Sequence, residues 1–325
     1  MRQHVFDELG LWVVPLPPYS VPSILATSAS LWSFPLGTFV VDMLKLLKLE
    51  LEKLFRARSF YLSFLVLIGF VTLMLWGFYT YAARKTGGEA VEQFKYTYES
   101  KQYFNGLTFA LYSLLFSFTL LLPIFVSMSA GSQIAGEARA GTLRMLCTRP
   151  ISRASLVLSK FLVTALHAAL LLAFFIGLNL AVGLIFVGWG NLELYPGPLN
   201  LVDAPGKIMR DEALMRFGYA VLSGTWALLV IAALALLCSV IFDSPAQAIV
   251  MTVAVYLTLY IVGRVEFFEH LRPYFFTTDM DFWRDVFKPE IPWQSLWHYA
   301  CVCGAYTAGL LLATVVIFER KDIVT

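Results

Sequence analysis

Residues 217–242 read FGYAVLSGTWALLVIAALALLCSVIF, and residues 244–263 read SPAQAIVMTVAVYLTLYIVG. Neither stretch contains Asp, Glu, Lys or Arg, and the single residue between them is Asp243. A helix needs about 20 mostly apolar residues to cross roughly 30 Å of hydrocarbon, and both stretches meet that length. Backbone N–H and C=O groups find no water there, so each stretch must satisfy them internally as an α-helix. Two adjacent membrane spans are therefore expected.

Charge is missing from four other long stretches of the chain as well. The composition agrees, since 59% of the 325 residues are apolar, 14% are charged and the mean hydropathy is +0.72. These values exclude an ordinary soluble protein. We predict an all-α polytopic membrane protein whose transmembrane domain, residues 59–325, holds six helices. The predicted spans are residues 59–83, 107–131, 156–188, 217–241, 245–263 and 295–318.

Residues 9–41 also lack charged side chains, but they are not expected to form a seventh span or a signal peptide. Asp7 and Glu8 spoil the basic start that a signal peptide needs, and five prolines interrupt any continuous helix. Residues 1–42 are therefore predicted to be an irregular segment lying on the membrane or on another subunit. The alternative is that translation starts at Met43. The five prolines are Pro15, Pro17, Pro18, Pro22 and Pro35.

Residues 43–58 show the period of an amphipathic helix. Leucines recur on one face, while charged side chains occupy the opposite face. The segment runs directly into the first predicted span, which favours a helix lying in the membrane interface and contacting lipid over a helix packed in the cytosol. The charged face is formed by Lys45, Lys48, Glu52 and Arg56.

The distribution of lysine and arginine indicates the orientation. With six spans both ends lie on the same side, and the connections on that side carry 12 Lys and Arg residues against 11 in the longer opposite loops. The higher density of positive charge marks the cytoplasmic side. We therefore predict a multi-pass protein of the inner (cytoplasmic) membrane with both termini in the cytoplasm.

The opposite loops are rich in aromatic residues, above all residues 264–294. Aromatic rings sit well at the level of lipid headgroups, so this stretch is predicted to hold short helices that dip into the outer leaflet as an aromatic belt. The rings expected at this level include Phe267, Phe268, Tyr274, Phe275, Phe276, Phe282, Trp283, Phe287 and Trp293, with Trp297 just after the stretch.

The spans carry almost no ionisable group, which argues against chemistry at membrane depth. His298 and Cys301 could share a helical face, but Cys303 points away from it, so no metal site is expected. The sequence also contains no Walker-type phosphate loop, HExxH or GxSxG motif. We expect no catalytic residue, metal or cofactor in this chain, and no nucleic-acid partner is expected because its net charge of +2 is too small to suggest one. Any energy source would lie on another subunit.

The most distinctive polar element is the connection between the second and third spans, residues 132–155. Residues 134–141 can continue the second span beyond the membrane, and residues 142–147 can form a short amphipathic helix that Pro150 ends. Ser152 can then cap the next helix. The segment would present four charged side chains to the cytoplasm: Glu137, Arg139, Arg144 and Arg149.

This segment resembles the coupling segment of ABC-2 type transporter permeases. The motif runs through Gly136-Glu137, Gly141-Thr142-Leu143, Pro150-Ile151-Ser152-Arg153 and Lys160. The basic entry Glu52-Lys53-Leu54-Phe55-Arg56 and the close Phe318-Glu319-Arg320-Lys321-Asp322-Ile323 agree with the same family. The resemblance covers residues 43–325, and it departs from the family at Ala138 and Ala140, where charged residues are common.

The resemblance implies a permease that works with a separate ATP-binding cassette ATPase and with a second permease chain, identical or related. Glu137 would be the acidic contact to the ATPase, Gly141 and Thr142 would start the coupling helix, and Arg139 and Arg144 would lie beside them. Pro150, Ser152 and Arg153 would shape the restart of the chain. Export or extrusion would be the direction of transport.

Two other interpretations remain open at this point. A motor-free channel or membrane scaffold needs no ATPase, but it leaves the ordered polar segment unexplained. An intramembrane enzyme would need a metal or an activated nucleophile at depth, and the spans offer neither pattern. The cargo and the choice between homodimer and heterodimer lie beyond the sequence.

Overall fold

The computed structural model describes residues 36–86, 105–143, 152–194 and 206–321. The chain divides into two units, residues 1–42 and residues 43–325. Residues 36–42 are the described part of the first unit, and they are helical rather than irregular, so the first helix begins before the predicted residue 43. The rest of the predicted irregular segment, residues 1–35, lies outside the described residues. The second unit contains the membrane-spanning helices.

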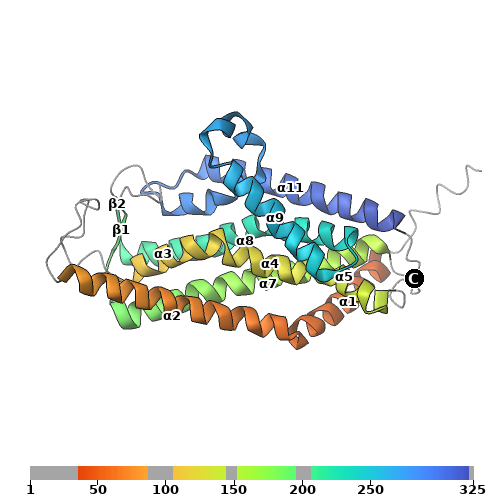
Figure 1. Ribbon diagram of the computed structural model, residues 1–325, viewed down its shortest axis with the longest axis horizontal. Coiled ribbons are helices and arrows are strands. Elements are labelled where there is room, and N and C mark those ends of the chain that lie inside the picture. The colour runs from red at the N-terminus through yellow and green to blue at the C-terminus, as the bar shows by residue number, and fades with distance from the viewer. Residues whose placement is uncertain (1–35, 87–104, 144–151, 195–205, 322–325) are drawn as a thin grey trace, which may run out of the picture. The chain divides into compact units, whose positions relative to one another are not determined.

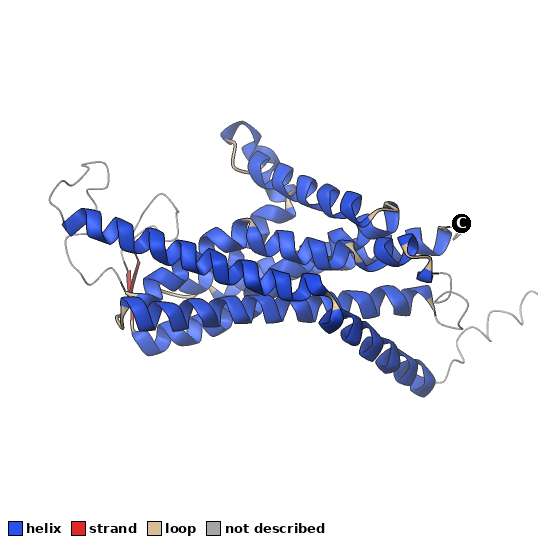
Figure 2. Cartoon of the chain, turned by 60° about the horizontal axis from the view of Figure 1, so that its bottom comes forward, coloured by secondary structure: helices blue, strands red, loops and turns tan. Residues whose placement is uncertain are grey.

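Helices account for most of the described part of the second unit (Figures 1 and 2). The α-helices of the bundle are α1 (Leu36–Arg56), α2 (Arg58–Thr86), α3 (Gly106–Thr119), α4 (Leu121–Gly131), the seven-residue α5 (Gln133–Arg139), α7 (Arg153–Val182), α8 (Arg210–Ile241), α9 (Pro245–Val262) and α11 (Trp293–Arg320). Short helices are the π-helix η4 (Gly183–Val187), the 3-10 helices η5 (Glu266–Tyr274) and η6 (Met280–Phe287), and α10 (Phe276–Asp279). Strands β1 (Leu192–Leu194) and β2 (Gly206–Ile208) pair antiparallel, with Leu192 opposite Ile208.

Among the described residues, five helices are long and apolar enough to cross a membrane, and a sixth span results if α3 and α4 are taken together. The five are α2, α7 with η4, α8, α9 and α11. Each predicted span coincides with one of these elements. The prediction of an all-α polytopic membrane protein is therefore confirmed.

The second span departs from the prediction of one continuous helix over residues 107–131. Helices α3 and α4 are bent by 45° at Leu120. Pro123 lies in the first turn of α4, where its ring and missing N–H remove the hydrogen bond that Thr119 would otherwise receive. The Tyr256 hydroxyl of α9 donates to the Thr119 carbonyl instead, at 2.8 Å. The bend is thus stabilised by a neighbouring helix.

Helix α8 forms the centre of the bundle. It packs against α4, α7, α9 and α11, which surround it in Figure 1. Its middle, residues 230–236, is buried on all sides, and three alanines there allow neighbouring helices to approach closely. The spans α2, α7, α9 and α11 bury a much smaller share of their length. Helix α8 is therefore the reference element for the segments described below.

The aromatic belt predicted for residues 264–294 is wrong for about half of its rings. Trp283 and Phe287 of η6 are fully buried, and Trp283 packs on Phe118 with ring centroids 4.8 Å apart. These rings form protein core because η6 lies against α8. Only the rings of η5 and the start of α11 remain exposed, as predicted for headgroup level: Phe267, Tyr274, Trp293 and Trp297.

Arg216 holds η6 in place from the first turns of α8. Its side chain is nearly buried, and it donates to the carbonyls of Val286, Lys288 and Pro289 at the end of η6. It also pairs with Glu212 one turn earlier. A cation bound to the last carbonyls of a helix satisfies acceptors that the helix itself leaves unpaired. The short helices are therefore fixed to the core of the bundle.

Candidate functional site

A buried charged cluster lies at the end of the bundle that carries α1 and α5, and α1 supplies its first members. Leu46, Glu50 and Leu54 recur every four residues and share one helix face. That face packs inward, so Glu50 is buried together with the two leucines, at 3% exposure. Lys53 lies one turn from Glu50 and stays half-exposed. The helical period thus carries a carboxylate into an apolar interface.

Helix α5 supplies the second carboxylate, and α8 fixes its start. The first N–H groups of a helix lack intrahelical partners. Here the Ser239 hydroxyl oxygen of α8 accepts from the N–H groups of Ile134 and Ala135, at 3.0 and 2.9 Å. Gly141, with φ of +70°, ends the segment in a left-handed conformation that glycine adopts readily. Glu137 lies between these two fixed points.

Helix α7 supplies the second lysine of the cluster. Ser152 caps the helix, because its hydroxyl oxygen accepts from the Ser155 N–H at 3.1 Å. Two turns further on, Lys160 points into the bundle and is fully buried. A lysine without any exposure requires anionic partners, since an isolated ammonium is very costly to bury.

The four side chains form a closed ring of ion pairs. Lys160 Nζ lies 2.8 Å from Glu137 Oε1 and 3.1 Å from Glu50 Oε1. Lys53 Nζ lies 2.7 Å from Glu137 Oε1 and 3.0 Å from Glu50 Oε1. Two carboxylates therefore alternate with two ammonium groups, and the ring is neutral. It joins α1, α5 and α7, which are far apart in the sequence.

The electrostatics of the ring keep Lys53 charged. Partial burial alone would lower the pKa of Lys53, but the hydrogen bond that Lys53 donates to Glu137 and the charges of Glu50 and Glu137 outweigh it and raise that pKa. Removing one partner from such a group would leave a buried charge uncompensated. The buried members Glu50 and Lys160 therefore depend most on their partners in the ring.

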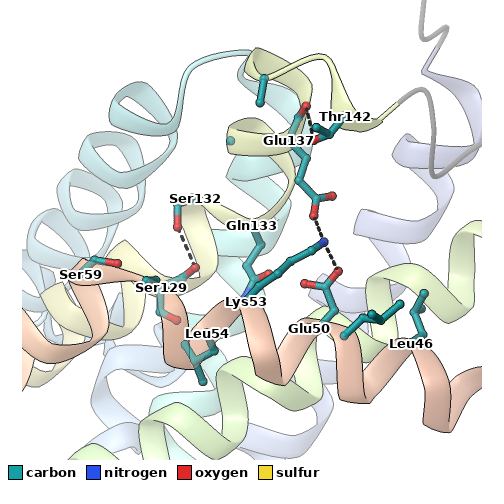
Figure 3. Close-up of a pocket in the computed structure, with 14 residues that line it drawn as sticks. Leu46, Glu50, Lys53, Leu54, Ser59, Ser129, Ser132, Gln133, Glu137 and Thr142 are labelled. Carbon is teal, nitrogen blue, oxygen red and sulfur yellow. Dashed lines mark hydrogen bonds and ion pairs between the residues drawn. The ribbon is translucent and has the colours of Figure 1, made fainter.

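A cleft of about 540 Å³ opens beside the ring, between α1 and the α4–α5 segment. Figure 3 shows Lys53 reaching across from α1 to Glu137, with Glu50 below it. The α1 wall carries leucines, and the opposite wall carries hydroxyl, amide and small side chains. A cleft of this size and mixed lining can hold a small molecule.

Comparison with known proteins places this architecture in a family. The family model described as ABC-2 family transporter protein matches residues 46–263. The chain belongs to the ABC-2 transporter family. The uncharacterized protein YhcI of Bacillus subtilis (strain 168) is 25% identical over 213 residues, which cover 64% of this chain and 66% of YhcI. The alignment therefore spans just under two thirds of that relative.

In this ABC-2 family chain, the residues predicted for coupling separate into two sets. Arg139, Gly141 and Thr142 are exposed at the end of the bundle. Glu137 differs from the prediction, because its carboxylate faces α1 and α7 and its side chain is only 13% exposed. The reason is that Lys160, buried behind it, requires an anion. Arg144 and Pro150 lie outside the described residues.

Arg153 ties the start of α7 to the end of α11. Its guanidinium donates to the carbonyls of Phe318, Glu319 and Lys321, at 2.5, 3.1 and 3.1 Å, and lies over the Phe318 ring. The cation thus satisfies the last carbonyls of α11. The sequence predicted that Arg153 shapes the restart of the chain after the coupling segment, and the contacts made here attach that restart to α11.

The charged face predicted for α1 is exposed: Lys45, Lys48, Glu52 and Arg56 all lie on the surface. The ring members Glu50 and Lys160 received no role from sequence reasoning. Glu50 could have been found from its four-residue spacing to Leu46 and Leu54, which places a carboxylate on the apolar face. Nothing in the sequence alone indicates that Lys160 reaches the same point, because the meeting depends on the packing of α7.

Proposed function

We propose that this chain is the membrane-spanning permease subunit of an ABC transporter, and that a separate ATPase subunit drives it. The observation that carries the proposal is the anchoring of α5. This seven-residue helix is bound to α8 through Ser239 and to both α1 and α7 through Glu137. One short helix at the end of the bundle thus connects to three others.

The proposed contact to the ATPase is the exposed edge after α5. Arg139 and Thr142 face away from the bundle, and Gly141 turns the chain between them. Force applied at this edge would pass through Glu137 to α1 and α7, because the ion pairs to Lys53 and Lys160 are short and partly buried. Glu137 would then transmit motion to the spans rather than contact the ATPase directly.

The membership in the ABC-2 family supports a wider assembly. Two permease chains, identical or related, would form the path, with two ATPase subunits beneath them. We propose export or extrusion across the cytoplasmic membrane, with both termini and the coupling segment on the cytoplasmic side. The density of lysine and arginine on that side supports this orientation.

The proposal is tested by affinity purification of the chain from its native membrane. An ATP-binding cassette ATPase is expected in equimolar amount, identified by mass spectrometry. The double variant Arg139→Glu/Thr142→Arg should lose the ATPase while retaining its own membrane insertion and thermal stability, because both side chains are exposed. Lys48→Glu, on the exposed face of α1, is the matched control and should retain the ATPase.

Recovery of the chain without any nucleotide-binding subunit would instead support a motor-free channel or scaffold. If the ATPase is retained equally by the double variant and the control, the edge at Arg139 is not the docking surface. The first outcome tests whether the chain works with an ATPase, and the second tests where the ATPase binds.

A further inference from the structure

The cleft beside the ion-pair ring has two chemically different walls. From α1 it is lined by Leu46, Leu49 and Leu54, with Ala57 at the junction to α2. From α4, α5 and the turn that follows it is lined by Ser129, Ser132, Gln133, Gly136, Glu137, Ala140 and Thr142 (Figure 3). An apolar wall facing a polar one fits an amphiphilic molecule, with its chain on the leucines and its head toward the hydroxyl groups.

The polar wall offers hydrogen-bond acceptors. The Ser132 hydroxyl donates to the Met128 carbonyl at 2.8 Å, and the Thr142 hydroxyl donates to the Glu137 carbonyl at 3.3 Å. Their protons are used, while their oxygen lone pairs remain available. Glu137 Oε2 and Ser129 Oγ are buried atoms of the same wall, and they have no hydrogen-bond partner among the described residues. A ligand head that donates hydrogen bonds therefore matches this wall.

The two lysines of the ring differ in how firmly they are held. Lys160 is fully buried and cannot leave without stranding charge inside the bundle. The Lys53 side chain is 52% exposed, and its long stem can carry the ammonium out to water. Lys53 thus places a removable ammonium group between the carboxylates of Glu50 and Glu137, at the edge of the cleft.

We propose that the cleft binds the primary-amine head of an amphiphile, whose ammonium replaces that of Lys53 between Glu50 and Glu137. The exchange conserves charge, because one ammonium leaves the ring as another enters. A primary ammonium offers three N–H donors to the carboxylates and to Ser132 and Thr142. A quaternary ammonium offers none, so the site discriminates between the two head groups. Leu49 and Leu54 contact the apolar part of the ligand.

Two sources could supply this chemistry: an aminophospholipid of the surrounding leaflet, or a free amphiphilic amine. The proposal does not rest on coupling to an ATPase. It is tested on the purified full chain in phosphatidylcholine nanodiscs, without nucleotide or ATPase, so its failure would leave the proposed function untouched. The probe is decylamine, with decanol of equal chain length as the control for partitioning, and binding is measured by calorimetry.

The two ring variants are expected to change decylamine affinity in opposite directions. Lys53→Gln removes the internal competitor and should tighten binding several-fold. Glu137→Gln removes a charge-assisted acceptor and should weaken it by about 10-fold or more, since such a hydrogen bond contributes roughly 1.5–3 kcal/mol. Lys48→Gln, on the exposed face of α1, should leave the affinity unchanged. Unfolding cannot explain a gain of affinity, so Lys53→Gln keeps the test decisive.

Binding of decylamine that is the same in Lys53→Gln as in the unaltered chain would overturn the proposal, as would decanol binding of equal strength. Native mass spectrometry then separates the sources. Retention of phosphatidylethanolamine over phosphatidylcholine by the unaltered chain, lost in Glu137→Gln, assigns the site to the lipid. Decylamine binding without such retention assigns it to a free amphiphilic amine.

Discussion

The Tyr256 hydroxyl of α9 donates a 2.8 Å hydrogen bond to the Thr119 carbonyl at the bend between α3 and α4. In a continuous helix that carbonyl would accept from the N–H of residue 123, which is a proline. The two helices are therefore interdependent, because α9 supplies the donor that the sequence of the second span lacks. Tyr256 is itself nearly buried, so water does not substitute for it.

Replacing this tyrosine should destabilise the bundle measurably. Tyr256→Phe leaves the Thr119 carbonyl without a donor, at a cost of about 1–3 kcal/mol. The measurement is thermal or denaturant unfolding of the purified chain in detergent. In a Pro123→Ala background the new N–H can serve Thr119, so Tyr256→Phe should cost less there. An equal cost in both backgrounds would mean that the hydrogen bond does not compensate for the proline.

The same region shows how far sequence reasoning reaches. The absence of charge predicted six spans, because burial in hydrocarbon constrains every residue of a span, and these stretches overlap the five long apolar helices and the bent pair α3–α4. Pro123 was visible in the sequence, yet a proline in the first turn of a helix needs no break, so the bend at Leu120 was not predicted. Its stability depends on Tyr256, 133 positions later than Pro123, and no local pattern links the two.

In the candidate site, too, some features follow from local sequence and others depend on the packing of distant helices. The polar segment after the second span, and the capping by Ser152, follow from local sequence. The ion-pair ring does not, since it requires α1, α5 and α7 to meet at one point. The prediction for the aromatic residues of 264–294 was partly wrong for a related reason. An aromatic ring suits a lipid headgroup layer and a protein core equally well, and Trp283 lies in the core because η6 packs on α8.

The buried lysine of the ring should be the most sensitive of its members. Lys160→Met removes the only fully buried cation of the four and leaves Glu50 and Glu137 partly uncompensated. A loss of about 3–5 kcal/mol in the free energy of unfolding is expected. The double variant Lys160→Met/Glu50→Gln should recover part of that loss, because it removes one of the stranded charges.

The control for this prediction is Lys48→Met, an exposed position of the same helix as Glu50. It should change stability by no more than about 0.5 kcal/mol. A Lys160→Met variant as stable as the unaltered chain would show that the ring contributes no net stability. Lack of recovery in the double variant would show that Glu137, rather than Glu50, carries the uncompensated charge.

The anchoring of α5 on α8 gives a further prediction. Ser239→Ala leaves the buried N–H groups of Ile134 and Ala135 without an acceptor, at a cost of roughly 1–3 kcal/mol. The loss should be local, so hydrogen–deuterium exchange of residues 133–139 should accelerate more than exchange in the middle of α8. Ser223→Ala, at a partly exposed position of α8, is the control. Uniform acceleration over both helices would argue against a local anchor.

The last prediction concerns pH and lies at the other end of the bundle. Burial raises the pKa of the Asp279 carboxyl above its usual 3.8, and the charge of His298 opposes this only in part. The folded state therefore binds the proton more tightly than the unfolded chain, so ionised Asp279 costs stability at neutral pH. Below pH 3.8 the carboxyl is protonated in both states, and the cost disappears.

Asp279→Asn should accordingly raise the melting temperature at pH 7, and the gain should shrink as the pH falls toward 3.8. Asp211→Asn, at an exposed position of α8, should give no comparable gain. A lower melting temperature for Asp279→Asn at pH 7 would mean that the carboxylate makes a favourable ionic contact, with His298 as its partner.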